Sequence, residues 1–168
     1  MRKHERKLLF ILIIFLTSCG TPQYEEVLSS IYSENSDEFQ QSKDEIVENM
    51  EILNNYFKYK LVDDSFILSK KIITESTDLD DTNFSVTLQL LDNDGLINDI
   101  RIHPEQYISF NQNEEGFLPT KWSTFRIIYS LDDEIDFESK FTDQANSVVE
   151  VKSFENDWIG VAIKSSLD

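Results

Sequence analysis

The spacing of apolar residues changes once along this chain, and this change constrains the fold more than any other feature. Up to Phe57 the apolar positions recur every three or four residues, which is the period of a helix with one buried side. From Phe66 onward they recur every second residue, as in strands with one buried face. Helices followed by strands predict an α+β domain, with one or two N-terminal helices and about seven mostly antiparallel strands.

Two helices are expected before residue 58. The first spans residues 22–33, with Thr21 as its N-cap and Pro22 in its first turn, where proline is favoured. The second spans residues 37–58 and follows a polar gap at 33–36. The alternative is one helix that bends at the gap. The apolar seam of the second helix consists of Phe39, Ile46, Met50, Leu53 and Phe57.

The rest of the chain is expected to form strands joined by short turns. Asp92 to Gly95 is a turn signal, because glycine readily adopts a positive φ, and it predicts a hairpin between its flanking segments. Residues 103–121 are expected to be a long irregular segment with a short edge strand at 107–110. The other expected strands are 66–74, 84–90, 96–102, 122–131, 135–141, 147–154 and 158–163. The last two are expected to pair as a hairpin across the turn at 155–157.

Short turns between successive strands favour an antiparallel meander, either as a sheet curled around the N-terminal helix or as a sandwich. This order of elements, with a late strand that begins at Trp158, resembles that of nuclear transport factor 2-like folds. The resemblance rests on element order and on no specific motif. It implies a cone-like sheet.

The first 18 residues have the pattern of a secretory signal peptide. Arg2, Lys3, Arg6 and Lys7 form a basic segment, and residues 8–16 are a run of nine apolar residues. A helix that spans a bilayer needs about 20 apolar residues, so this run is too short to span one.

Leu16, Thr17, Ser18 and Cys19 resemble the lipobox of bacterial lipoproteins, in which an apolar residue and two small residues precede an invariant cysteine. The resemblance covers residues 1–19. It implies that a signal peptidase recognises residues 16–18 and cuts before Cys19, and that Cys19 carries a diacylglyceryl group and usually a further acyl chain, such as palmitate. Two or three acyl chains anchor a protein durably, since each buried CH₂ contributes about 0.8 kcal/mol. The alternative is an ordinary signal peptide with a chance cysteine.

These features divide the chain into a cleaved signal peptide (1–18), a lipid-anchored N-terminus (19–21) and one acidic α+β domain (22–168). The expected location is the cell envelope, with acyl chains of Cys19 in the membrane. In Gram-negative lipoproteins an aspartate after the cysteine favours retention at the inner membrane. Gly20 lacks that signal, so the outer membrane is favoured if the source is Gram-negative.

The expected mature chain is strongly acidic, with 11 Lys and Arg against 31 Asp and Glu. This balance argues against nucleic acid as a partner, because such binding depends on cations that neutralise phosphates. It favours a cationic protein partner. Cys19 is the only cysteine, so an intramolecular disulfide and a thiolate metal cluster are excluded.

No catalytic motif stands out, and we expect neither enzymatic activity nor a cofactor or metal site. His103 is the only histidine after the signal peptide, and we interpret it as a surface histidine in a turn. The four glycines are too far apart for a nucleotide-binding loop. The aspartates at 92 and 94 fit a hairpin turn better than a calcium loop, and the acidic clusters at 78–81 and 132–136 fit solvated turns better than weak calcium sites.

A binding surface is expected around the two tryptophans. Trp122 and Arg126 share the less apolar face of one expected strand, and Trp158 lies on the less apolar face of another, beside small residues. Trp and Arg are enriched in binding hot spots. The alternative, which we favour, is that helices cover this face.

Together these observations favour a lipid-anchored envelope protein with a non-catalytic role, in partner binding or in structure. A narrower alternative is an inhibitor or immunity protein against a basic secreted hydrolase, whose association would slow as salt increases. A second alternative is a small-ligand-binding lipoprotein, which would have an apolar cavity between helix and sheet.

Overall fold

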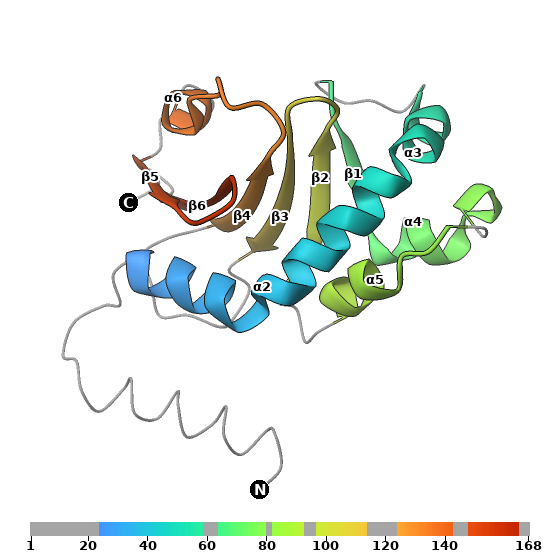
Figure 1. The fold of residues 1–168 in the computed structure, drawn as a ribbon, viewed down its shortest axis with the longest axis horizontal. Coiled ribbons are helices and arrows are strands. Elements are labelled where there is room, and N and C mark those ends of the chain that lie inside the picture. The colour runs from blue at the N-terminus through green and yellow to red at the C-terminus, as the bar shows by residue number, and fades with distance from the viewer. Residues whose placement is uncertain are drawn as a thin grey trace, which may run out of the picture.

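The computed structural model describes residues 24–58, 64–79, 82–92, 97–113, 124–142 and 148–164. They form a curled, open antiparallel sheet of six strands in the order β1-β2-β3-β4-β6-β5, with helices on both faces (Figure 1). The expected α+β class is confirmed, and six strands are close to the seven expected. The lipobox residues, Cys19 and Trp122 lie outside the described residues.

The strands are β1 (Phe66–Leu68), β2 (Asp99–His103), β3 (Tyr107–Asn113), β4 (Thr124–Ser130), β5 (Val148–Ser153) and β6 (Trp158–Lys164). The helices are α2 (Tyr24–Glu48), α3 (Met50–Phe57), α4 (Lys70–Glu75), α5 (Ser85–Asp92) and α6 (Phe137–Thr142), with a 3₁₀ turn at Thr77–Leu79. No helix in the described part of the chain has the length and hydropathy needed to cross a bilayer.

The helix α2 crosses one face of the sheet and bends at Asn35, whose φ of −135° and ψ of 19° are not helical. The Asn35 side chain donates to the carbonyl of Ile31 at 2.9 Å. A second asparagine, Asn49, makes the same bond to the carbonyl of Glu45 at 2.8 Å, where α2 ends and α3 follows. The expected helices are present, and the first bend falls in the expected polar gap.

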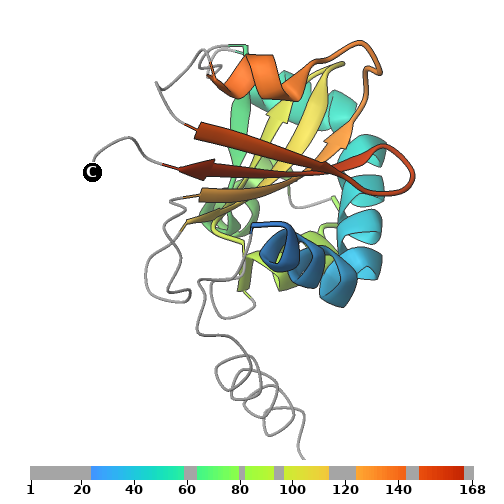
Figure 2. The same cartoon turned by 90° about the vertical axis from the view of Figure 1, so that its left-hand side faces the viewer.

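The two faces of the sheet carry separate apolar clusters. The larger cluster lies between the sheet and the helices α2, α3 and α5, and contains Phe39, Ile46, Phe110 and Trp158. The smaller lies under α6 and contains Tyr107, Ile128, Phe141 and Val161. Figure 2 shows α6 and the N-terminal part of α2 on opposite sides of the β5–β6 hairpin.

The expected strand at 84–90 is wrong, because this segment forms the helix α5. The carboxylate of Glu45, buried on α2, accepts hydrogen bonds from the backbone N–H groups of Val86 and Thr87, both at 2.9 Å. It also accepts the hydroxyls of Ser85 and Thr87. These N–H groups have no partner inside the helix, so a carboxylate from another element stabilises the helix start.

The expected strand at 66–74 is only partly correct, since β1 ends at Leu68. Ser69 then caps α4, its hydroxyl accepting the N–H of Ile72 at 3.4 Å. The expected strand at 135–141 is the helix α6. Phe137 and Phe141 are four residues apart and both buried, which suits one helix face as well as one strand face.

The expected hairpin between residues 84–90 and 96–102 is also wrong. The strand β2 pairs instead with β1 and with β3, which follows a tight turn at 104–106. The expected edge strand at 107–110 is the inner strand β3, which reaches Asn113 and pairs with β2 and β4. The expected strand at 122–131 is confirmed by β4, and the final hairpin by β5 and β6.

Candidate functional site

Trp158 starts β6 and is buried under α2, with 1% of its surface exposed. Its indole packs against Phe39 and Phe110, with ring centroids 6.0 and 5.9 Å away. Its N–H donates to Gln40 Oε1 on α2 at 3.2 Å. The favoured alternative, in which helices cover this face, is therefore the arrangement found for Trp158.

The space beside Trp158 is filled, although its neighbour two residues along is a glycine. A Cβ added to Gly160 would lie 2.9 Å from the Phe154 ring and 3.1 Å from a methyl group of Leu28. Glycine therefore permits α2 to approach the strand closely at this point.

Arg126 does not share a surface with Trp158. In the register of β4 and β6, Trp158 lies opposite Tyr129, and Tyr129 and Arg126 are an odd number of residues apart. Side chains alternate between the faces of a strand, so Arg126 points away from α2, toward the face that carries α6. The expected grouping of these two residues is wrong. Both lie on the less apolar face of their own strand, but the pairing of β4 with β6 places these two faces on opposite sides of the sheet.

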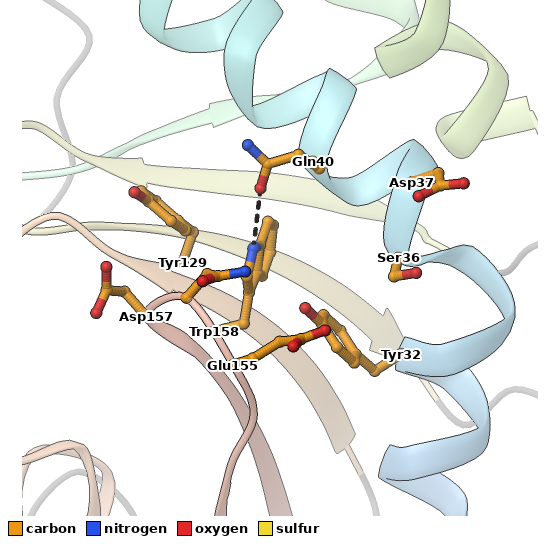
Figure 3. A pocket seen from close by; sticks show the side chains of 9 residues that line it. Tyr32, Ser36, Asp37, Gln40, Tyr129, Glu155, Asp157 and Trp158 are labelled. Carbon is orange, nitrogen blue, oxygen red and sulfur yellow. Dashed lines mark hydrogen bonds between the residues drawn. The ribbon is translucent and has the colours of Figure 1, made fainter.

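A pocket of about 340 Å³ opens at the edge of the aromatic cluster, between α2 and the β5–β6 turn (Figure 3). Figure 3 shows residues of α2 on one side, the turn on another, and the rings of Tyr129 and Trp158 at the sheet. The pocket is lined by Tyr32, Ser36, Asp37, Gln40, Tyr129, Glu155, Asn156, Asp157 and Trp158.

The turn that borders this pocket has a constrained backbone. Asn156 and Asp157 both have positive φ angles, 55° and 66°. Two central residues with positive φ match the twist of a hairpin, and Asn and Asp tolerate this conformation better than most residues. The N–H of Trp158 closes the turn onto the carbonyl of Glu155 at 3.3 Å. The carboxylates at 155 and 157 are thus held at the pocket by a tight turn.

The pocket combines negative charge with aromatic rings. Asp37, Glu155 and Asp157 are exposed, and within the described ranges none of them forms an ion pair. Burial, together with the charge of Glu155, raises the pKa of Tyr32 above its ordinary value. The Lys43 ammonium lies 4.8 Å from the centre of the Tyr129 ring, so this aromatic wall already accepts one cation.

The α2 side of this pocket was not among the binding residues expected from the sequence. Tyr32, Ser36 and Gln40 are spaced by four residues, a spacing typical of one helix face, and all three line the pocket although α2 bends at Asn35 between the first two. That stripe was visible in the sequence, but its position opposite the 155–157 turn was not.

The other candidate residues make contacts within the fold. His103 ends β2 and its carbonyl accepts the N–H of Gln106 across the 104–106 turn, so its expected place at a turn is confirmed. It is half-buried and stacks on Tyr107 at 4.2 Å, so it is not a fully exposed surface residue. Asp132 and Asp136 accept backbone N–H groups of Glu134 and Ser139. Across the residues that the structure describes, no group of three potential ligands has a geometry that could hold a metal ion.

No protein-family model, curated protein or solved structure matches the chain. The site is therefore interpreted from its own geometry. An acidic pocket with an aromatic wall is chemically suited to bind an organic cation, such as an ammonium or guanidinium group.

Proposed function

We propose that the chain is a lipid-anchored envelope protein with a non-catalytic, partner-binding role. The pocket between α2 and the 155–157 turn would receive a lysine or arginine side chain of a protein partner. The observation that carries this proposal is the position of three carboxylates without cationic partners around an aromatic wall. The proposed anchor is Cys19 with its acyl chains, since the first 19 residues resemble a lipoprotein signal.

The energetics favour a cation in this pocket. A cation over an aromatic ring contributes about 0.5–1 kcal/mol at an exposed site and about 2 kcal/mol when desolvated. The carboxylates add charge-assisted hydrogen bonds. The net charge of −17 of the whole chain would also steer a cationic partner toward it.

The narrower alternative is an inhibitor or immunity protein against a basic secreted hydrolase. The three carboxylates around the pocket favour this alternative, because such an inhibitor would have to bind a cationic enzyme surface. Salt distinguishes it from a structural role: the association rate with a basic hydrolase should fall steeply when ionic strength rises from about 0.15 to 1 M, as the Debye length shrinks from about 8 to 3 Å. The second alternative, a small-ligand carrier, would here take a small organic cation, because the lining is largely polar.

The test uses the soluble chain from Gly20 with a photo-crosslinking residue in place of Ser36, which lines the pocket. The matched position is Ser139, which is exposed on α6. We expect a basic protein of the envelope extract to crosslink at position 36 and not at 139.

Two charge-matched variants make this test specific. The first neutralises the pocket (Asp37→Asn, Glu155→Gln, Asp157→Asn), and the second neutralises three exposed carboxylates elsewhere (Glu51→Gln, Asp133→Asn, Glu138→Gln). We expect the crosslink to disappear only in the first. Equal loss of the crosslink in both variants would mean that net charge alone controls binding, and would contradict the role of the pocket.

The anchor is tested separately. Cys19→Ser should abolish incorporation of a palmitate analogue and release the protein from the membrane fraction. Unchanged labelling would refute lipidation at this residue.

A further inference from the structure

The sheet face opposite α2 is only partly covered. The helix α6 packs on it through the smaller apolar cluster, over β4, β5 and β6. The same face of β2, β3 and β4 carries a polar patch beside that cluster, as the strand register shows. We call it the arginine face, and it consists of Asp99, Arg101, His103, Ser109, Asn111 and Arg126.

Two arginines of this face lack acidic partners. Within the described ranges, Lys43, Lys70 and Lys71 pair with Asp44, Asp92 and Glu75, whereas neither Arg101 nor Arg126 forms an ion pair.

The two arginines are close together. Arg101 lies opposite Ser109 on β3, and Arg126 lies opposite Asn111 on the other side of the same strand. Their backbones are thus two strand spacings apart across the sheet, roughly 10 Å, and two residues apart along it, roughly 7 Å. The resulting separation of roughly 12 Å is one that two arginine side chains can bridge. The positive charge of Arg101 lowers the pKa of Arg126, after burial as the main cause.

Lys140 of α6 brings a third positive charge to this place. Its ammonium lies 4.8 Å from the centre of the Tyr107 ring and donates to Gln106 Oε1 at 2.8 Å. Burial and then the charges of Lys140, Arg101 and Arg126 lower the pKa of His103 to about 4, with Asp64 as the opposing charge. Three cations therefore act on one imidazole.

The guanidinium groups have unused donors. The Nε atoms of Arg101 and Arg126 are buried and have no hydrogen-bond partner. The Arg126 guanidinium lies over the Phe141 ring, 4.7 Å from its centre. A buried donor without an acceptor is costly. Because these Nε atoms are buried, each side chain must move before it can donate to an external acceptor, and this movement relieves the cost.

The carboxylate on this face is already engaged. Asp99 accepts the amide of Asn111 at 2.6 Å, and Asn111 in turn accepts the Ser109 hydroxyl at 2.7 Å. Both Ser109 and Asn111 are buried. This chain of bonds holds Asp99 beside β3. The charge of Asp99 acts on Arg126, but among the described residues it forms no ion pair with either arginine.

We propose that the arginine face binds a phosphate group between Arg101 and Arg126. The three cations Arg101, Arg126 and Lys140 stand against two carboxylates, Asp99 and Asp64, which leaves an excess of one positive charge and favours an anion. Planar guanidinium groups bind phosphate oxygens in pairs. The site lies on the face opposite the acidic pocket and is independent of the proposed partner binding. The phosphate comes either from a small soluble molecule or from a lipid headgroup.

His103 provides a direct readout, because it is the only histidine in the chain from Gly20 onward. Its pKa is measured by NMR with and without inorganic phosphate, at constant ionic strength set with sodium chloride. In the pH range where this imidazole titrates, phosphate is a monoanion, and its negative charge beside the ring favours the protonated form, so the pKa should rise from about 4 by roughly one unit. An unchanged pKa in saturating phosphate and with phosphate-bearing vesicles would overturn the proposal.

Variants test the assignment to the two arginines. Arg101→Gln and Arg126→Gln should each weaken phosphate binding about tenfold or more, because each removes charge-assisted hydrogen bonds. Arg126→Lys keeps the charge and loses the paired geometry, so it should bind with intermediate affinity. Lys71→Gln removes an exposed cation of α4 and should bind as the parent does. Equal affinity in the parent and in both glutamine variants would refute the site, and circular dichroism checks that each variant folds.

The source of the phosphate is read from two probes. Glycerol phosphate represents soluble phosphate esters, and vesicles with a phosphatidic acid fraction represent headgroups, with neutral vesicles as control. Binding of either probe that requires both arginines supports the proposal and identifies the source.

Discussion

The two faces of the sheet differ in how much apolar surface they bury and in where their charged side chains lie. The face under α2 is packed with large apolar side chains, and its charges lie at the edge, as carboxylates around the pocket. The face beside α6 has a smaller apolar cluster and carries two half-buried arginines in the middle of the strands. Stability therefore resides mainly on the first face, whereas the second bears buried charge whose cost suggests a purpose other than folding.

The largest expected effect tests the packed face. Trp158→Ala removes a fully buried indole that contacts rings of α2 and β3, and should lower the free energy of unfolding by about 3–5 kcal/mol in urea denaturation. Phe141→Ala, on α6, should lower the free energy of unfolding by less, because the apolar cluster that contains Phe141 is smaller. Equal losses would mean that the two faces stabilise the fold equally.

Glu45→Gln tests how α2 determines α5. The amide keeps one acceptor oxygen but loses the charge that attracts the first N–H groups of α5, so we expect a loss of about 1–3 kcal/mol. Glu48→Gln, on an exposed position of the same helix, is the control. Hydrogen exchange of residues 86–90 should rise in the first variant only, and unchanged protection would contradict the capping role.

The pH dependence tests the charged face. The pKa of His103 is about 4 in the fold, below its unfolded value of 6.5, so its neutral form stabilises the fold. This contribution is complete above pH 6.5 and is lost as the pH falls toward 4, because the unfolded chain takes up the proton first. His103 is half exposed, so solvent screening limits the effect to about 1 kcal/mol. His103→Gln should reduce the loss of stability between these pH values, and parallel curves for variant and parent would disprove the assignment.

The smallest effect concerns Arg126. Arg126→Met replaces a half-buried guanidinium with an unsatisfied Nε by an apolar chain of similar length, so stability should change by less than about 1 kcal/mol, in either direction. A loss of several kcal/mol would show that the arginine holds the fold together, and would remove the contrast between the two faces. Thermal unfolding of both proteins in phosphate-free buffer provides the measurement.

The local sequence pattern was sufficient to predict an element where the apolar spacing or turn residues of that element were present in its own segment. The seam of Phe39, Ile46 and Leu53 predicted a helix on a sheet, and all three are buried. The 155–157 turn predicted the final hairpin. The pattern from Phe84 to Leu90 misled, because Phe84, Leu88 and Leu91 also fit a helix, and the buried carboxylate of Glu45, about forty positions earlier in the chain, favours the helix.

By itself, the sequence determined the α+β class, the helical character of the N-terminal segment, the strand β4 and the last hairpin, because each depends on neighbouring residues and on the period of their burial. It also carries the lipoprotein signal, which stays a prediction. The tertiary structure alone decided that β3 is an inner strand, that α2 covers Trp158, and that Arg126 faces away from it next to Arg101. These arrangements depend on strand register, and a shift of one residue moves a side chain to the other face.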